Sequence, residues 1–356
     1  ALDKHDPTDI IVVISKPPAK EVRDEVVQLL QNVSKPVVAI FLGEKPDHHE
    51  GNVYLAHTLE ETAQIAVDLA NGREVKKNYC TPAVSPIDHV LSSEKTVKGL
   101  YSGGTLAAEA GMMISEALDL GGLIKEEGYI LKTNGYEVID LGDDIYTQGK
   151  PHPMIDPEVR IRKIREYAAD KDTGVILLDC VLGYGCHPDM AGCLAPVIRE
   201  SMDKAKAEGR ELYFVASVCG TDKDPQDYRQ SVETLKASGA FVEESNAKAI
   251  RLALKLKGLD CVEEDKAVVP YTGPKFEVPE VSEQILDLLN TKPRIINIGV
   301  ESFNESIVKY NGKSVQFSWK PAAGGNKEMI RIIHELNKIK EINEYNDQVV
   351  QRLKDA

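Results

Sequence analysis

Strand-like and helix-like segments alternate along almost the whole of this 356-residue chain. The strand-like runs, such as Ile10 to Ile14 and Val37 to Leu42, are apolar throughout and do not alternate with polar residues. Strands of this kind are buried on both faces, as in a parallel sheet, and the helical segments between them supply right-handed crossovers. The sequence therefore predicts an α/β protein with parallel, doubly wound sheets.

Two polar, proline-containing stretches interrupt the alternation and predict more than one domain. The segment before the first interruption is short for a doubly wound domain, which usually needs about five strands. We therefore expect part of that domain to lie outside the given sequence. The predicted organisation is a partial first domain over 1–75, a linker over 76–97, a second domain over 98–257, a connector over 258–293, and a C-terminal strand–helix–strand unit over 294–356 that ends in one long helix over 328–354.

The charge balance limits the classes of partner. Lys and Arg number 43 against 57 Asp and Glu, which gives a formal net charge of −14, and no Lys/Arg-rich block is present. Nucleic acids and anionic membrane surfaces are bound through such blocks, so neither is an expected partner. An anionic small molecule would have to be held locally, by helix ends and single basic residues.

Other features indicate a cytoplasmic protein. The longest apolar runs have strand length, well below the roughly 18 residues of a membrane helix, and the opening residues do not resemble a signal peptide. The six cysteines are scattered without a CxxC pair, as is typical of reduced thiols. Cys186, His187 and Cys193 are close in sequence, but three such residues are too few to predict a metal site.

The stretch from Leu100 to Ala110 reads as a strand, a Gly-Gly turn and a helix start. The first turn of a helix has free N–H groups and a partial positive charge, and it can hold an anion. The candidate anion-binding residues are Ser102, Gly103, Gly104 and Thr105, with phosphate, an acyl phosphate or a carboxylate as the ligand class. The alternative is that Gly-Gly serves only close packing between the strand and the helix.

Ligands of parallel α/β sheets bind beyond the carboxyl ends of the strands, and several Gly-rich loops fall there. We expect the loops 102–105, 142–144, 179–189 and 219–224 to converge on one crevice of the second domain. In the second of these loops, Gly142, Asp143 and Asp144 would orient a polar substrate or carry Mg²⁺ with several waters. The alternative is a turn that caps a helix.

Three prolines stiffen the segment Lys150 to Pro157 around one histidine and one aspartate. His152 would polarise a carbonyl when neutral or act as a general acid when charged. Asp144 and Asp156 are further catalytic candidates, although Asp156 equally suits a helix N-cap before a proline. His48, His49 and His57 are expected to face solvent.

The remaining candidates lie in other loops. Arg229 would neutralise a bound phosphate or carboxylate. Gly-Gly-Asn-Lys before the last helix repeats the anion-site pattern of the first loop. The sequence contains no Gx₄GK[ST], GxSxG or HExxH motif. The candidate binding residues in these loops are Gly183, Gly185, His187, Thr221, Arg229, Gly324, Gly325, Asn326 and Lys327.

Taken together, the motifs resemble the FdrA family, whose members are relatives of the α subunit of succinyl-CoA synthetase. The resemblance extends over essentially the whole sequence. It implies two flavodoxin-like ligase domains, the first one truncated here, and a preceding CoA-binding-like Rossmann domain. The motifs that carry it are Val13 to Ala19, Phe41 to Gly43, Gly99 to Ala110, Ile139 to Asp144, Pro151 to Pro157, Leu177 to Asp179, Gly220-Thr221, Asp224-Pro225, Ile296 to Gly299 and Ala323 to Lys327.

One departure from the family's relatives bears on function. Succinyl-CoA synthetases carry phosphate on a histidine in a Gly-His-Ala-Gly loop, whereas the matching loop here, Cys219 to Arg229, contains no histidine. The comparable place in the first domain, from Phe41 to His49, also lacks Gly-His-Ala-Gly. Phosphohistidine chemistry, and with it ATP-dependent CoA ligation, is therefore not favoured.

The resemblance instead implies a component of an oxamate carbamoyltransferase in anaerobic allantoin and purine breakdown, in which oxalurate and phosphate give oxamate and carbamoyl phosphate. Residues 102–105 would hold the phosphate, His152 would polarise the carbonyl, and Arg229 or Lys327 would pair with the carboxylate. Companion subunits and an oligomeric complex are expected. The alternatives are an NDP-forming acyl-CoA ligase, which would use CoA and ATP, and a non-catalytic assembly subunit.

Overall fold

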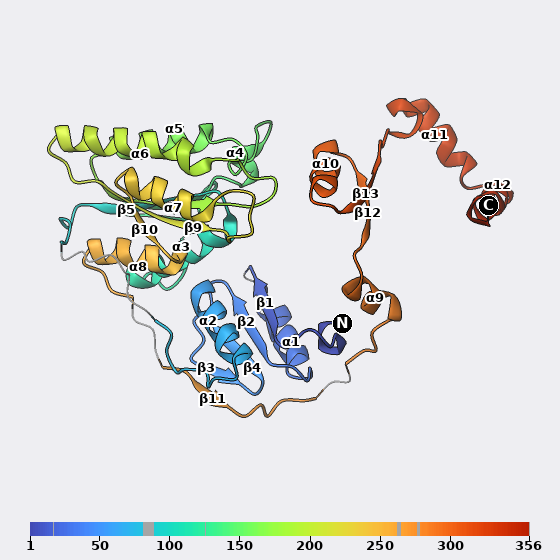
Figure 1. The fold of residues 1–356 in the computed structure, drawn as a ribbon, viewed down its shortest axis with the longest axis horizontal. Helices are drawn as coiled ribbons and strands as arrows, with labels where there is room; N and C mark the ends of the chain where they lie inside the picture. The colour runs from blue at the N-terminus through green and yellow to red at the C-terminus, as the bar shows by residue number, and fades with distance from the viewer. Residues whose placement is uncertain (17, 81–88, 125, 262–264, 276–277, 356) are drawn as a thin grey trace. The chain divides into compact units, whose positions relative to one another are not determined.

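The computed structural model describes residues 1–16, 18–80, 89–124, 126–261, 265–275 and 278–355 (Figure 1). It consists of two compact units, Ala1–Leu289 and Asn290–Ala356. Within the described residues the first unit holds a five-stranded and a six-stranded sheet.

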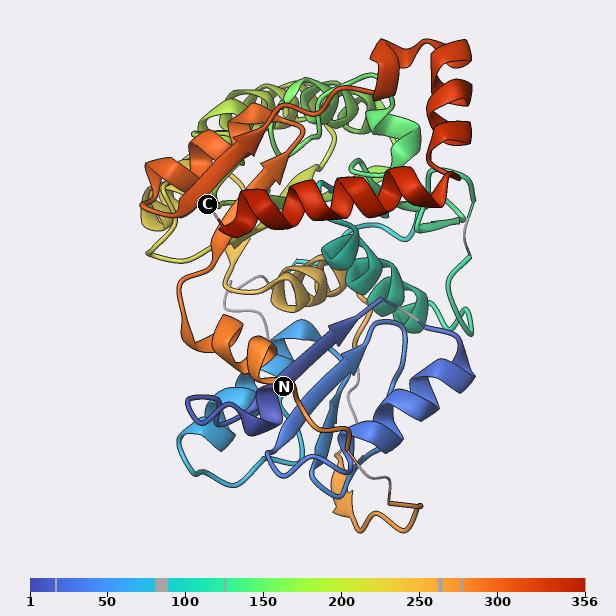
Figure 2. The ribbon, with the colours of Figure 1, turned by 90° about the vertical axis from the view of Figure 1, so that its right-hand side faces the viewer.

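The five-stranded sheet has the strand order β1-β2-β4-β3-β11. Three of its strands are parallel, whereas β3 runs antiparallel to β4. Helices α1 and α2 cover opposite faces of the sheet (Figure 2). Strand β11 comes from the segment predicted to be a connector. The elements are β1 Ile11–Ser15, α1 Lys20–Leu30, β2 Val37–Phe41, β3 His48–Glu50, β4 Val53–Ala56, α2 Leu59–Ala70 and β11 Ala267–Val269, with a short helix η1 at Leu2–Lys4.

The six-stranded sheet has the order β10-β9-β8-β5-β7-β6, and β6 is its one antiparallel strand among the described residues. Its parallel strands, numbered along the chain, follow the flavodoxin-like order 2-1-3-4-5. This confirms the predicted α/β class with parallel, doubly wound sheets. The elements are β5 Thr96–Tyr101, α3 Gly104–Ala117, β6 Leu131–Thr133, β7 Tyr136–Asp140, α4 Asp144–Thr147, α5 Glu158–Ala169, β8 Thr173–Val181, α6 Met190–Ala207, β9 Tyr213–Cys219, α7 Tyr228–Ala237, β10 Phe241–Glu243 and α8 Asn246–Leu256.

Two apolar layers hold this sheet between its helices. Helices α3 and α8 pack on one face, and α5, α6 and α7 on the other. Polar side chains fix where several helices begin, because each accepts a hydrogen bond from a backbone N–H of the first turn. These caps are Thr58 of α2, Asp189 of α6, Asp227 of α7 and Ser245 of α8.

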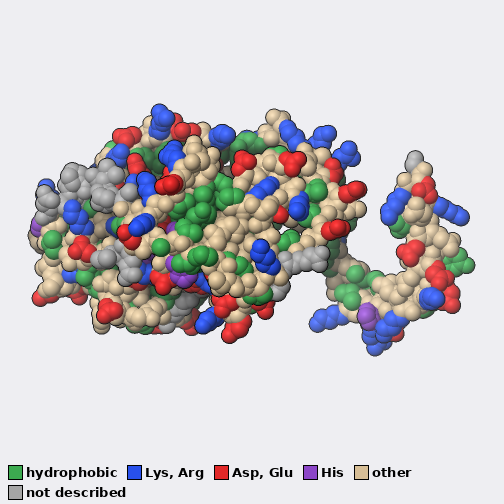
Figure 3. Space-filling view, turned by 90° about the horizontal axis from the view of Figure 1, so that it is seen from below, with side chains coloured by type: hydrophobic (Ala, Val, Ile, Leu, Met, Phe, Trp, Pro, Cys, Tyr) green, Lys and Arg blue, Asp and Glu red, His purple; other side chains and the backbone are tan. Residues whose placement is uncertain are grey.

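The C-terminal unit contains one parallel strand pair and exposes much of its apolar surface. Ile296 is 70% exposed and Val315 is 67% exposed, and no residue of its helices α10, α11 and α12 is buried in the described chain. Figure 3 shows apolar side chains at the molecular surface among charged groups of both signs. The last elements are α9 Glu283–Asn290, β12 Arg294–Ile298, α10 Glu301–Lys309, β13 Lys313–Phe317, η2 Ala322–Gly325, α11 Lys327–Leu336 and α12 Lys340–Asp355.

The single long helix predicted over 328–354 is wrong, because α11 ends at Leu336 and α12 begins at Lys340. Between them the N–H groups of Lys338 and Ile339 donate to carbonyls three residues back, which is a tighter turn than the α-helix. The Asn343 side chain donates to the Asn337 carbonyl at 2.8 Å. Asparagine is a poor helix former, so this position favours the break.

Two histidines expected to face solvent are buried. His49 is 1% exposed and its Nδ1 accepts a hydrogen bond from the Leu55 N–H at 3.1 Å. His57 is 3% exposed, and its Nε2 lies 2.9 Å from Glu116 Oε1. The His48 side chain remains 43% exposed, as predicted. His49 lies on β3, next to which β11 pairs, and His57 contacts Glu116 of α3. Neither burial has a sequence period that would reveal it.

None of the helices in the described part of the chain has both the length and the apolar character that crossing a bilayer requires.

Burial makes stability sensitive to the charge of His49. Desolvation, with Lys266 and His48 nearby, lowers the pKa of His49 to about 4, whereas an unfolded histidine titrates near pH 6.5. The unfolded chain therefore binds the proton first, and the stabilising contribution is complete above about pH 6.5 and is lost as the pH falls toward 4.

We predict a weaker pH dependence for His49→Asn, which keeps an acceptor near the position of Nδ1. Between pH 7 and pH 4 the free energy of unfolding of the native chain should fall by about 3 kcal/mol more than that of the variant. Urea unfolding at a series of pH values measures this difference. His334→Asn, at an exposed position of α11, is the matched control and should keep the native pH dependence. Equal slopes for the native chain and His49→Asn would contradict the assignment.

Candidate functional site

The six-stranded sheet has a topological switch point at the carboxyl end of β5. Strand β5 lies between β7 and β8, and the connections on its two sides pass over opposite faces of the sheet. Open α/β sheets bind ligands at this position, outside the carboxyl ends of the strands. The loops after β5, β7, β8 and β9 all lie along this edge.

Helix α3 begins at the switch point with a glycine cap. Gly103 precedes the helix in an extended conformation, and no side chain caps it within the described residues. The Ala107 N–H donates to the Gly103 carbonyl, so the N–H groups of Gly104, Thr105 and Leu106 precede the first intrahelical bond. These three amides and the positive end of the helix dipole can bind an anion.

A buried ion pair holds the turn that leads into α3. The Ser102 N–H donates to both carboxylate oxygens of Asp179 at 3.0 Å, and the Ser102 Oγ donates to Asp179 Oδ2 at 3.0 Å. Arg160 Nη2 lies 2.9 Å from Asp179 Oδ1 and also donates to the Asp179 carbonyl. The side chains of Arg160 and Asp179 are fully buried. The N–H and hydroxyl groups of Ser102 are therefore held by Asp179 and are not available to a ligand.

Asp140 brings a second carboxyl group to the start of α3. Its Oδ1 accepts a hydrogen bond from the Gly142 N–H at 2.9 Å. Its Oδ2 lies 2.5 Å from the position that a Cβ on Gly104 would occupy, so only glycine allows this approach. Burial raises the pKa of Asp140, and the charges of Asp143 and Asp179 add to that effect, while the Gly142 hydrogen bond and Lys16 oppose it.

His152 presents one ring nitrogen to the same place. Its Nδ1 accepts a hydrogen bond from the Met154 N–H at 3.2 Å, so the neutral ring carries its proton on Nε2. A Cβ on Gly142 would lie 2.7 Å from His152 Nε2, 3.0 Å from the Ser102 carbonyl oxygen and 3.1 Å from Asp140 Oδ1. The Nε2–H group and the Asp140 carboxyl thus flank the turn at Gly142, and together they can donate or exchange a proton.

Backbone contacts join the neighbouring loops. The His187 N–H donates to the Met154 carbonyl at 2.7 Å, and the Met154 methyl group lies near Gly103. The Gln226 amide group bonds both the N–H and the carbonyl of Gly183 and also reaches the His187 carbonyl. The expected convergence of the loops after β5, β7, β8 and β9 on one edge is therefore seen in these contacts.

Other predicted residues of this sheet have local structural roles. Asp143 caps α4 by accepting from the Ile145 N–H at 3.2 Å, and Asp144 lies exposed in the first turn. Asp156 accepts from the Glu158 N–H at 2.8 Å at the start of α5. These roles match the capping alternatives that the sequence left open.

The remaining predicted residues form local turns, are exposed or belong to the C-terminal unit. The side chain of Arg229 is 84% exposed, 3.8 Å from Asp222. The Thr221 N–H donates to Asp224 at 2.6 Å, and the ring of His187 bonds the Asp189 N–H and lies 3.8 Å from Cys193 Sγ. Gly185 has a positive φ in the loop after β8. Gly324, Gly325, Asn326 and Lys327 are in the C-terminal unit, where Asn326 caps α11.

The sequence analysis did not select Asp140, Asp179, Arg160 or Lys16 as site residues. Asp179 had a detectable signal, since it is a charged residue inside the otherwise apolar run Val175 to Val181. Asp140 likewise ends an apolar strand. Across the described residues, no three His, Cys, Asp or Glu side chains are grouped so that they could hold a metal ion.

The stretch of sequence that holds this edge is similar to a known protein family. Residues 100–256, which run from the last residues of β5 to the end of α8, match the family model described as CoA-ligase. The chain is also 36% identical to the uncharacterized protein YahF of Escherichia coli strain K12. The alignment extends over 263 residues and covers 70% of this chain and 51% of YahF. The chain thus spans about half the length of that curated relative.

A solved structure also aligns, but weakly. It is the Escherichia coli RcsC C-terminus with its linker region and phosphoreceiver domain, at 8% identity and a TM-score of 0.21, over 70% of this chain and 93% of that one. Such a superposition carries no argument about function. The CoA-ligase match supports an acyl-CoA ligase-like, succinyl-CoA synthetase-like domain in this chain.

The buried pair beneath α3 leads to a stability prediction. Arg160→Met leaves the Asp179 carboxylate buried without its charge partner, and such a change typically costs about 3–5 kcal/mol. We therefore expect Arg160→Met to lower the free energy of unfolding, measured in urea, by that amount. Arg165→Met is the matched control on the same helix, because its partner Glu200 and Arg165 itself are exposed, and it should cost about 0.5 kcal/mol or less. Equal losses for the two variants would show that the buried pair does not stabilise this turn.

Proposed function

We propose that this chain binds phosphate at the N-terminus of α3 and, as the FdrA-type subunit of a hetero-complex, transfers a carbamoyl group between oxalurate and phosphate, giving oxamate and carbamoyl phosphate. The observation that carries the proposal is the start of α3 itself, where N–H groups without a side-chain cap lie beside the Asp140 carboxyl, and His152 Nε2 flanks the nearby turn at Gly142. An anion site, a hydrogen-bond donor and a titratable carboxyl group therefore share one edge of the sheet.

Each of these groups has a defined task in the reaction. The α3 amides hold the phosphate, whose oxygen attacks the carbamoyl carbon and forms the new C–O bond. The His152 Nε2–H donates to the carbonyl oxygen, which gains negative charge as the bond forms. The C–N bond to the oxamate part then breaks, and the departing nitrogen takes the proton that the phosphate gives up. Asp140, whose pKa is raised by burial, can carry that proton.

The CoA-ligase match over residues 100–256 favours a second candidate, an NDP-forming acyl-CoA ligase. That activity would require CoA and ATP and, in its usual form, a phosphorylated histidine. The loop after β9, from Cys219 to Arg229, has no histidine. His152 and His187 are the histidines of the neighbouring loops at the same edge, so either would have to serve instead. A third candidate is an assembly subunit without catalysis, which would retain the fold but not depend on His152.

The test uses the full chain together with the subunits that co-purify with it. Oxalurate and phosphate are added without CoA or ATP, and the formation of carbamoyl phosphate is measured. We expect phosphate-dependent product. His152→Ala should lower kcat by about 10²–10⁴-fold, the typical contribution of one positioned proton donor. His48→Ala, an exposed histidine on β3, is the control and should leave kcat unchanged.

The other outcomes separate the candidates. ADP formed only when CoA, ATP and a carboxylate are added would establish the ligase and refute carbamoyl transfer. Product formation that survives His152→Ala undiminished would place the reacting groups in a companion subunit and make this chain an assembly component.

A further inference from the structure

The C-terminal unit has secondary structure but no core of its own. Among its described residues, from 290 to 355, none is buried. It contains one parallel pair of strands and helices of 9, 10 and 16 residues. A lone strand pair is at best marginally stable in water, and helices of this length gain most of their stability by packing an apolar face. The unit therefore needs an apolar partner surface.

Helix α12 has the most regular of these uncovered faces. Its apolar residues Ile342, Tyr345, Val349 and Leu353 recur at spacings of three and four, which places them in one stripe along the helix. Tyr345 is 68% exposed and Leu353 is 72% exposed. A stripe of this width is typical of the seam between two packed helices.

Two opposite charges flank this stripe, one near each end of the helix. Glu341 lies in the first turn of α12 and Arg352 in the last. The eleven residues between them (352 − 341) make about three full turns, so both side chains lie on the same side of the stripe. Neither has a hydrogen bond or ion pair within the described part of the chain.

This charge pattern is self-complementary only when two copies of α12 run in opposite directions. An antiparallel pair places Glu341 of each copy opposite Arg352 of the other, whereas a parallel pair places like charges together. In the antiparallel register, Val349 of one helix falls between Ile342 and Tyr345 of the other, so the apolar side chains interleave. The two helix dipoles also oppose each other favourably in this arrangement.

We propose that the C-terminal unit is a surface for homodimerisation, in which α12 packs antiparallel on α12 of a second copy of this chain. Both copies use the same patch, as a two-fold axis requires. A specific interface buries about 800 Å² on each partner, which is more than one short helix provides. The exposed apolar residues of the preceding helix α11, Met329, Ile332 and Leu336, extend the contact. This inference is independent of the proposed function, because it involves neither α3 nor His152.

The experiment measures the mass of the full chain, purified alone, by sedimentation equilibrium at a series of concentrations. We expect a reversible dimer with twice the 39.2 kDa mass of one chain. Val349→Glu keeps a good helix former but places a carboxylate in the seam. It should raise the Kd of the dimer at least tenfold.

Reversal of the flanking charges tests the direction of the helices. Arg352→Glu sets two carboxylates against each other at both ends of the pair and should raise the Kd of the dimer about tenfold. The double variant Glu341→Arg with Arg352→Glu restores both pairs and should return the Kd to within about threefold of the native value. Lys354→Glu is the matched control. It makes the same charge change in the same turn but about 200° around the helix from Arg352, so it should leave the Kd within about threefold.

Three results would overturn the inference. A native chain that stays monomeric at every concentration would exclude the dimer. A dimer whose Kd is unchanged in Val349→Glu would use another surface. A double variant that dimerises as weakly as Arg352→Glu, or a Lys354→Glu variant weakened to the same extent, would exclude the antiparallel pairing of Glu341 with Arg352.

Discussion

The turn between β5 and α3 depends on one buried carboxylate. Asp179 accepts the N–H and the hydroxyl of Ser102 and pairs with Arg160, and both charged side chains are fully buried. Burying two charges costs desolvation free energy, which only good geometry and further hydrogen bonds offset. The effect of the pair is to fix the position of the turn, because the backbone of Ser102 is held on the sheet and the N–H groups of the next residues are left facing outward. The candidate site, the approach of Asp140 and the place of His152 all follow from this fixed turn.

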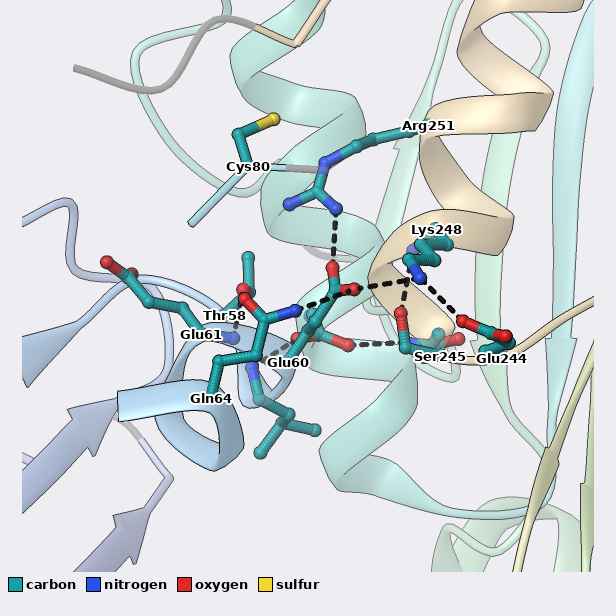
Figure 4. A network of polar contacts seen from close by, with 12 residues as sticks. Thr58, Glu60, Glu61, Gln64, Cys80, Glu244, Ser245, Lys248 and Arg251 are labelled. Atoms are coloured by element: carbon teal, nitrogen blue, oxygen red, sulfur yellow. Dashed lines mark hydrogen bonds and ion pairs between the residues drawn. The ribbon is translucent and has the colours of Figure 1, made fainter. Parts of the chain in front are cut away.

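The second constraint is the charged interface between the two sheets of the first unit. Glu60 of α2 meets Arg251 of α8 at 2.6 Å and Lys248 of the same helix at 3.6 Å, and the side chains of Glu60 and Arg251 are almost fully buried (Figure 4). Ion pairs of this kind contribute little net stability compared with apolar packing, but they penalise misaligned docking because a displaced partner stays buried and uncompensated. An interface of this composition fixes the relative placement of the sheets better than an apolar one.

The sequence predicted the strands and helices of the second domain well, because their apolar periods and caps are local. The Gly-Gly turn at Gly103 does begin a helix, as its pattern predicts. The errors concern features that only the folded chain defines. The burial of His49 depends on β11, which joins the sheet from more than 200 residues away. The role of Asp140 depends on the strand order, which places β7 next to β5. The break after Leu336 depends on a competition between local hydrogen bonds that helical periodicity does not register.

The acidity of the chain explains why the site has this composition. A protein of net charge −14 with Asp140 and Asp143 at one strand edge repels anions there. Asp179 and Arg160 neutralise each other beneath the turn and add no net charge to this edge. Two sources of positive potential remain at the start of α3, namely the helix dipole and Lys16 of the neighbouring sheet. Burial also shifts Asp140 toward its neutral form, which removes part of the opposing charge. The electrostatic potential at this edge is therefore a balance of several weak terms, and the docking of the two sheets contributes to it by placing Lys16 near the start of α3.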